Sequence, residues 1–220
     1  MSMSIPYEAT GRTNQKARTR AALLAATREL LVEGITPTVE QAADRAAISR
    51  TTAYRYFPNQ RALLVATYPP LESSSLLDEA APNDVDERLA IAAERFTTQV
   101  LQYEPELRTQ LRLSLEPGGT PTEALPLRQG RAIAWIEEVL TPLKGRLPKR
   151  ELRRLVLALR ATMGIEALIW LTDVAGVSRK EAVQIMQWSA RALLRSALAE
   201  AKEKSRAQVA RGSDARSENL

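Results

Sequence analysis

The sequence contains no histidine and no cysteine among its 220 residues. Catalytic triads and dyads built on an imidazole or a thiolate are therefore excluded. Structural zinc sites with Cys and His ligands, disulfides and Fe–S clusters are excluded for the same reason. We predict a chain without a metal or cofactor. An enzyme with this composition would depend on carboxylate, lysine, tyrosine, serine or arginine chemistry.

Glycine and aromatic residues are also scarce, with 9 glycines and an aromatic fraction of 5%. Alanine, leucine and arginine dominate over the strand-forming residues, which favours an all-α fold. A hydrophobic fraction of 45% is enough for a sizeable core. The most apolar stretch, residues 155–174, is interrupted by Arg160, Glu166 and Asp173 and predicts a buried helix, not a membrane span. Since the N-terminus also has no signal-peptide pattern, we expect a soluble cytoplasmic protein without a membrane partner.

The positive charge is concentrated near the N-terminus. The first 66 residues carry nine basic and five acidic side chains, whereas the remaining 154 carry 22 and 21. A local basic excess is typical of a surface that binds a polyanion such as nucleic acid, although basic helix faces are often only solvated.

Apolar periodicity and breaker residues divide the chain into helical segments. We predict helices over residues 14–33, 39–46, 50–57, 86–103, 105–115, 122–144, 149–174 and 179–204. Asn59 is the predicted N-cap of a further helix, which must break or end at Pro69-Pro70. The termini, residues 1–13 and 205–220, are predicted to be disordered, and residues 71–85 are the best candidate for an interdomain linker.

Residues 38–57 carry the pattern of two short helices joined by a tight turn. Thr38 and Ser49 are the predicted N-caps, and Gln41 completes a capping box with Thr38. Helices that cross closely need a small side chain where their backbones meet, and Ala43 supplies it. The flanking apolar positions fall where a helix-turn-helix core needs them: Ala42, Ala46, Ile48, Ala53 and Tyr56. The alternative is an ordinary helical hairpin.

The second of these helices presents polar side chains on its first turn. Its free N–H groups and dipole favour a phosphate there. Arg50 can bond guanine O6 and N7 in a bidentate way, and the hydroxyls of Thr51 and Thr52 can reach phosphates or base edges. Tyr54 and Tyr56 are long donors beside them. Together with the local positive charge, this turn favours DNA binding.

The run A-A-D-R-A-A-I-S-R-T-T-A-Y-R-Y-F-P-N-Q-R-A-L-L resembles the DNA-binding segment of the TetR family of bacterial transcription regulators. The resemblance covers residues 14–67 in detail, and M-G-I-E-A-L-I-W-L-T-D-V-A-G-V-S-R-K-E-A resembles the last two helices of the family more loosely. It implies an all-α chain with an N-terminal three-helix helix-turn-helix domain at residues 14–68. A C-terminal helical domain for effector binding and dimerisation would follow at residues 69–204, between the arm 1–13 and the tail 205–220.

The resemblance further implies a homodimeric regulator, expected to be a repressor, that binds a palindromic double-stranded DNA operator and is released by a small organic effector. Carried over to this sequence, the DNA contacts are Thr38, Ser49, Arg50, Thr51, Thr52, Tyr54, Tyr56 and Gln60. Two positions depart from the family. Ala47 stands where the family usually has glycine, and it costs about 1–2 kcal/mol if that position needs a positive φ. Gln60 replaces a phosphate-binding lysine, which removes one ionic contact that Arg61 is placed to compensate.

The helices predicted at 149–174 and 179–204 are apolar around most of their circumference. One face can pack within the chain, and the other requires a further partner. A second copy would build a four-helix interface, for which we predict Ile185, Met186, Trp188 and Leu193. The alternative is a large monomeric core.

The resemblance places an effector cavity among the middle helices. The candidate lining residues are Phe96, Tyr103, Trp135, Met163 and Trp170, with Arg112, Arg131 and Glu166 as polar anchors. This mostly apolar set favours a hydrophobic or aromatic effector. Thiol-redox sensing and a histidine pH switch are excluded by composition.

Two alternatives stay open at this stage. One is an effector-independent DNA-binding protein, because Pro69-Pro70 interrupts the helix that links pocket and DNA head in the family. The other is an all-α enzyme that uses carboxylates. The sequence has no Asp-Asp-x-x-Asp run and no Walker-type glycine loop, and the adjacent pair Glu137-Glu138 points apart on a helix, so we predict that the chain is not an enzyme.

Overall fold

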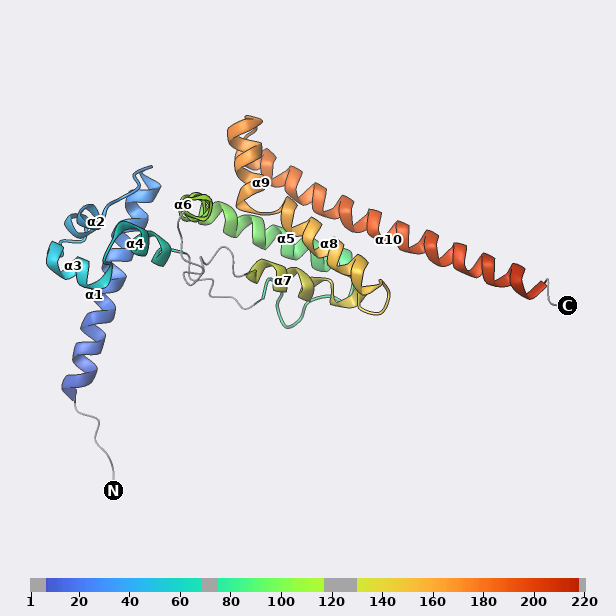
Figure 1. Cartoon of the computed structure of the whole chain (residues 1–220), viewed down its shortest axis with the longest axis horizontal. Helices are drawn as coiled ribbons and strands as arrows, with labels where there is room; N and C mark the ends of the chain where they lie inside the picture. The colour runs from blue at the N-terminus through green and yellow to red at the C-terminus, as the bar shows by residue number, and fades with distance from the viewer. Residues whose placement is uncertain (1–6, 69–74, 117–129, 218–220) are drawn as a thin grey trace, which may run out of the picture. The chain divides into compact units, whose positions relative to one another are not determined.

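A computed structural model describes residues 7–68, 75–116 and 130–217 (Figure 1). The described residues contain helices and no β-strand, with one isolated bridge between Lys144 and Leu147. The predicted all-α class is therefore confirmed. The chain divides into two compact units, residues 1–70 with 103–129 and residues 71–102 with 130–220.

The first unit contains four N-terminal helices and one helix from later in the chain. These are α1 (Tyr7–Val32), α2 (Val39–Arg45), α3 (Arg50–Tyr56), α4 (Gln60–Ala66) and α6 (Glu104–Leu115). Its main core joins α1, α2, α3 and α4 through Leu23, Leu24, Val39, Ala42, Ala43, Ala53, Phe57 and Leu63. Ala43 and Ala53 are completely buried, as the predicted close crossing of α2 and α3 requires.

Helix α6 packs against α1 and α4. Its buried Gln110 donates from Nε2 to the Leu64 carbonyl at 2.7 Å, and Leu113 packs with Leu31 and Leu64. The sequence predicts a domain boundary at residue 68. The structure in addition attaches α6 to the first unit, since the apolar face of this helix covers α1 and α4.

The three predicted N-caps are confirmed. The Thr38 hydroxyl accepts from the Gln41 N–H, and the Gln41 side chain accepts from the Thr38 N–H, which completes the capping box. Ser49 caps α3, and Asn59 caps α4 by accepting from the Ala62 N–H at 2.8 Å. Helix α4 ends at Ala66, so it stops before Pro69-Pro70, which lies outside the described residues.

The turn between α2 and α3 has Ala47 in the left-handed region, with φ of 53°. Ala47 is the one non-glycine residue with positive φ among the described residues. Its Cβ makes this conformation unfavourable by about 1–2 kcal/mol, the cost expected if the turn keeps the geometry that glycine normally allows.

Replacing Ala47 with glycine is therefore expected to stabilise the protein by roughly 0.5–1 kcal/mol, because relief of the left-handed strain exceeds the entropy lost from the unfolded chain. Urea unfolding followed by circular dichroism measures the change. Ala46→Gly is the matched control, because Ala46 has φ of −82° and should only lose stability. Equal destabilisation by both substitutions would show that Ala47 is not strained.

The second unit is formed by the remaining helices. They are α5 (Val85–Gln102), α7 (Arg131–Val139), the 3-10 turn η2 (Thr141–Leu143), α8 (Lys149–Thr162), α9 (Ile165–Ile169), the π-helical turn η3 (Trp170–Val174) and α10 (Arg179–Ser217). Helix α10 packs along α5 and α8, and α7 packs against both α5 and α8. Arg88 of α5 donates to the carbonyls of Glu138 and Val139, which satisfies the C-terminal end of α7.

The structure differs from the predicted helix at 149–174 by a break after Thr162. Gly164 lies at the break, and a Cβ there would be 2.1 Å from Arg160 Nη1 and 2.3 Å from Glu166 Oε2. Any larger residue at this position would require the ends of these two side chains to shift. Of the predicted helix 122–144, residues 122–129 lie outside the described residues, and the rest ends in η2 where Pro142 follows Thr141.

Two predictions of disorder are corrected. Helix α1 begins at Tyr7, within the predicted arm, and α10 continues to Ser217 through most of the predicted tail. Both segments are too polar to bury a core face, which led to the prediction. Each continues a longer helix, and adding residues to an existing helix costs little because nucleation has already occurred.

No single helix in the described ranges is long and apolar enough to cross a membrane. Only together do α8 and the segment formed by α9 and η3 reach the length and apolar composition of a membrane span, and the two are bent by 43° relative to each other. Their apolar residues Leu155, Val156, Leu159 and Leu168 are buried in the second unit.

Candidate nucleic-acid interface

The packing of α2 against α3 leaves the first turn of α3 exposed to solvent. The Ser49 hydroxyl accepts from the Thr52 N–H at 3.3 Å and donates to the Thr52 Oγ1 at 2.8 Å. Ala53 points into the core, so Arg50 and Thr51 on the other side of the helix are exposed. The Arg50 side chain is 66% accessible. This arrangement presents a guanidinium and a hydroxyl from a rigid helix end.

Two acidic residues of α2 contact the exposed face of α3. Arg50 Nη2 lies 3.3 Å from Asp44 Oδ2, and the Tyr54 hydroxyl donates to the Glu40 carboxylate. This hydrogen bond lowers the pKa of Glu40 and raises the pKa of Tyr54 from their ordinary values. Sequence reasoning missed both acidic residues. The i, i+4 spacing of Glu40 and Asp44 was the available signal.

The other predicted DNA contacts lie at different depths. Thr38 is exposed, and its hydroxyl is engaged in the α2 cap. Tyr56 is half-buried and packs against the core of the first unit, so its ring supports the fold. Tyr54 is exposed at the surface beside Arg50.

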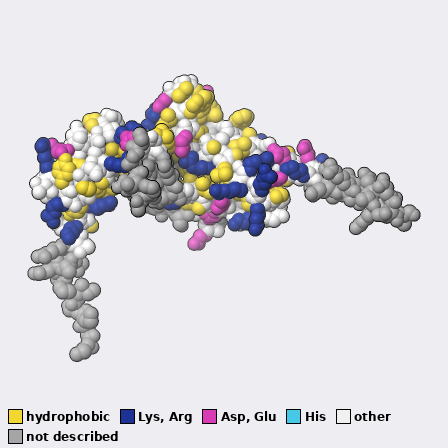
Figure 2. All heavy atoms as spheres, in the orientation of Figure 1, with side chains coloured by type: hydrophobic (Ala, Val, Ile, Leu, Met, Phe, Trp, Pro, Cys, Tyr) yellow, Lys and Arg dark blue, Asp and Glu magenta, His cyan; other side chains and the backbone are white. Residues whose placement is uncertain are grey.

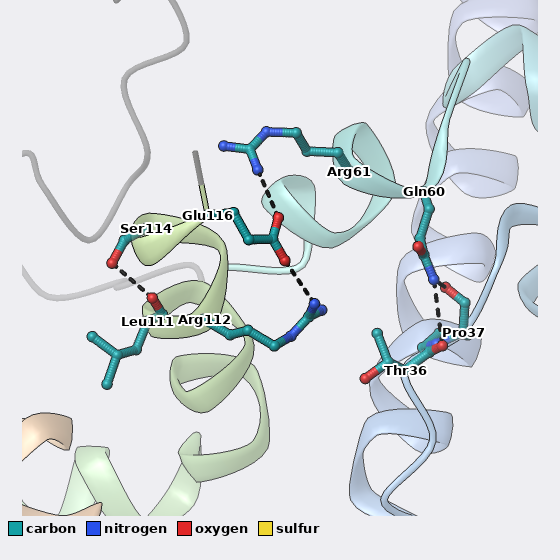
Figure 3. A network of polar contacts seen from close by, with 8 residues as sticks. All are labelled: Thr36, Pro37, Gln60, Arg61, Leu111, Arg112, Ser114 and Glu116. Atoms are coloured by element: carbon teal, nitrogen blue, oxygen red, sulfur yellow. Dashed lines mark hydrogen bonds and ion pairs between the residues drawn. The ribbon is translucent and has the colours of Figure 1, made fainter. Parts of the chain in front are cut away.

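Gln60 and Arg61 at the start of α4 have separate partners (Figure 3). Gln60 donates from Nε2 to the Pro37 carbonyl at 3.0 Å, which ties α4 to the loop before α2. Arg61 Nη1 donates to Glu116 Oε2 at 3.2 Å, and Arg112 Nη1 donates to the other Glu116 oxygen at 2.8 Å. Gln60 thus has a structural bond in place of the ionic contact that a lysine would offer, and Glu116 connects the start of α4 with the end of α6.

The N-terminal half of α1 and the end of α3 add exposed positive charge. Lys16, Arg18 and Arg55 are exposed, and Arg20 lies over the Phe57 ring at 5.6 Å from its centroid. Within the first unit, the basic groups therefore accompany the helix-turn-helix, as the charge distribution predicted.

The predicted effector-lining residues divide into buried and exposed groups. Phe96, Trp135 and Met163 are buried, and the first two rings meet edge to face with centroids 6.3 Å apart. Trp170 is 59% exposed, and Glu166 is an exposed partner of Arg160 at 3.2 Å. Trp170 and Glu166 are therefore surface groups of the second unit, because the chain bends at Gly164 and turns the face of η3 outward.

Tyr103 and Arg112 of the predicted set belong to α6 in the first unit, where Tyr103 is half-buried at the N-cap. Arg131 is exposed at the start of α7.

A cavity of about 580 Å³ lies elsewhere in the second unit, between α5 and the segment that precedes it. Its lining residues are Ser75, Leu76, Ile91, Glu94, Arg95, Thr98 and Gln99. None of them was predicted. Arg95 is fixed there by Asp78 and by the Leu76 carbonyl at 3.1 Å, while the buried Gln99 Oε1 has no hydrogen-bond partner among the residues that the structure describes.

The predicted interface residues also separate by burial. Trp188 and Met186 both lie on α10. Trp188 is 66% exposed, whereas Met186 is buried and faces the core of its own chain. Ile185 and Leu193 are half-buried. Trp188, Trp170 and the 71% exposed Val174 are large apolar groups left uncovered in the second unit. Figure 2 shows hydrophobic side chains gathered over α9 and the start of α10.

The adjacent pair Glu137-Glu138 does not form a carboxylate dyad. Glu137 pairs with Arg153 at 3.0 Å, whereas Glu138 accepts from the Ser75 hydroxyl at 2.9 Å. Their separate partners agree with the prediction that the two side chains point apart.

Comparison with known proteins adds to this geometry. Residues 23–67 match the model of the tetR family of bacterial regulatory proteins, and these residues include all of α2, α3 and α4. A similar solved structure is the crystal structure of a TetR transcriptional regulator from Rhodococcus sp. RHA1, with 19% sequence identity and a TM-score of 0.51. The match covers 82% of this chain and 97% of that one, and it supports the fold. No curated protein matches the sequence. The helix-turn-helix at residues 23–67 is therefore that of the tetR family of bacterial regulatory proteins, and it is a DNA-binding segment.

Proposed function

We propose that the protein represses transcription as a homodimer that binds a palindromic operator through α3. The observation that carries this proposal is the exposed first turn of α3, held in place by the buried crossing at Ala43 and Ala53. Arg50 reads guanine in the major groove, and Thr51 contacts a neighbouring base edge or phosphate. Thr38 and the exposed basic groups of α1 contact phosphates and set the register.

A second copy of the chain covers the apolar surface of the second unit. Trp170, Val174 and Trp188 would leave water on association, and large aromatic groups of this kind carry much of the energy of protein interfaces. A two-fold axis through this surface gives two equivalent DNA heads. Such a dimer requires a palindromic operator with half-sites about one helical turn apart.

A small organic effector releases the dimer from the operator by binding in the second unit. The cavity at α5 supports an effector with an apolar body and a donor for the Gln99 Oε1. This ligand would favour a conformation whose head spacing does not fit the operator. The effector-independent alternative has its own support, because the predicted pocket aromatics Phe96 and Trp135 are packed against each other in the core.

The experiment that tests this proposal combines binding selection with a ligand screen. Purified protein selects from random double-stranded DNA, and the selected duplex then reports on release by compounds that raise the melting temperature. Recovery of a palindrome bound by two chains is expected, with release by at least one stabilising compound. A recovered palindrome without any stabilising or releasing compound across a broad library supports the effector-independent alternative.

A further inference from the structure

The exposed faces of α2 and α3 are joined by two matched polar contacts. Glu40 and Asp44 are one turn apart on α2, and Tyr54 and Arg50 are one turn apart on α3. Asp44 contacts Arg50 near the turn, and Glu40 contacts Tyr54 one helical turn further from it. We call these four residues the acidic ladder.

The ladder places carboxylates beside the groups that meet DNA in the proposed function. Asp44 and Arg50 form an exposed ion pair, and Glu40 accepts an exposed hydrogen bond from Tyr54. Exposed polar contacts of this kind contribute little to folding, so the stability of α2 and α3 does not explain them. A carboxylate close to the DNA backbone is repelled by phosphates, which lowers the affinity for any duplex. This penalty is useful only if the same carboxylates improve the choice between sequences.

The contact between Asp44 and Arg50 leaves most of the guanidinium available. Arg50 uses Nη2 toward Asp44, and a guanidinium has five N–H donors in a fixed fork. Arg50 can therefore keep Asp44 while its remaining donors bond guanine O6 and N7. A phosphate in place of the guanine would face both the guanidinium and the carboxylate, so the gain from that contact is smaller.

The contact between Glu40 and Tyr54 works in the same direction. The Tyr54 hydroxyl has one proton, which it donates to Glu40. Tyr54 must give up this hydrogen bond before it can donate to a phosphate. Contacts with the DNA backbone, which every sequence offers, are thereby weakened.

We propose that Glu40 and Asp44 are specificity-determining residues that position Tyr54 and Arg50 and restrict their contacts with the DNA backbone. The proposal rests on the proposed base reading by Arg50. Asp44 also orders a long exposed side chain before binding, which reduces the entropy that Arg50 loses at the operator.

Asp44→Asn and Glu40→Gln test the ladder, with Glu33→Gln as the matched control. The control removes the same charge from the same unit, but Glu33 pairs with Arg45 at 2.8 Å and lies outside the ladder. Fluorescence anisotropy measures affinity for the selected operator and for a random duplex over a range of salt concentrations. Thermal melts check that these nearly isosteric substitutions leave the fold intact.

Each ladder variant is expected to bind random DNA about 3–10-fold more tightly relative to the control, because one carboxylate no longer repels the phosphates, with a smaller change at the operator. For Asp44→Asn, the slope of log affinity against log salt on random DNA steepens by about one per head, since Arg50 then contacts a phosphate. The ratio of operator to random affinity falls accordingly.

The ladder proposal is overturned if the control changes random-DNA binding as much as the ladder variants, because net charge alone then explains the effect. It is also overturned if the variants leave both the affinity ratio and the salt slope unchanged. If the wild-type protein shows no sequence preference, the proposed function fails instead. Random-DNA affinity and its salt slope still decide whether the ladder restricts backbone contacts.

Discussion

Replacement of Arg50 with alanine is expected to reduce operator affinity by about 1–3 kcal/mol, or roughly 5- to 150-fold, with a much smaller loss on random DNA. The reason is the position of Arg50 on the first exposed turn of α3, where a bidentate bond to guanine distinguishes this base from the other three. Truncation removes this bond and leaves guanine O6 and N7 without their partner. Anisotropy titrations with both duplexes at one salt concentration measure the two losses.

Arg55→Ala is the control for this experiment. Arg55 is an exposed arginine in the last turn of the same helix, so its removal changes the charge equally without affecting the first turn. Its loss should be similar on the operator and on random DNA. Equal losses on both duplexes for Arg50→Ala as well would show that Arg50 contacts phosphate and does not read a base.

Replacement of Trp188 with glutamate is expected to weaken the dimer by about 2–4 kcal/mol, or roughly 30- to 1,000-fold in its dissociation constant. Trp188 is a large apolar side chain left mostly exposed on α10, in the same unit as the exposed Trp170 and Val174. A charge at this position would have to lose its hydration when the second copy covers it. Sedimentation equilibrium over a range of protein concentrations measures the shift from dimer to monomer.

Val32→Glu is the matched control, because Val32 is an equally exposed apolar residue at the end of α1 in the first unit. The dimer dissociation constant of the Val32→Glu variant should equal that of the wild type. An unchanged sedimentation mass for Trp188→Glu would remove Trp188 from the interface, and a monomeric wild type would remove the dimer from the proposal.

The helix-turn-helix was predictable because its determinants are local. The caps at Thr38, Ser49 and Asn59 act over three residues, and the small side chain at Ala43 is required by a crossing of adjacent helices. A cost at Ala47 was predicted for the case that the turn requires a positive φ, and the structure has a φ of 53° there.

Features that depend on distant parts of the chain were not predictable in this way. The attachment of α6 to α1 and α4 rests on Gln110 and Leu113, whose partners are more than 40 residues earlier in the chain. The outward position of Trp170 follows from the break at Gly164, where an ion pair crosses the backbone. Periodicity alone assigns a tryptophan to an apolar face, but it does not say whether that face is turned toward the core or the solvent.

The charge pattern predicted the DNA-binding region but not the role of its acidic residues. The basic excess of the first 66 residues does accompany the helix-turn-helix. A net charge counts the acidic side chains only as a reduction of the positive charge. It does not show that Glu40 and Asp44 contact Tyr54 and Arg50, two of the predicted DNA contacts.

The most direct test of sequence-specific regulation is selection of bound duplexes from random DNA by the purified full-length protein. We expect enrichment of a palindrome with two half-sites about one helical turn apart, bound by two chains and at least 10³-fold more tightly than random DNA at physiological salt. Recovery of duplexes without a common sequence, or equal affinity for selected and random DNA, would contradict the account.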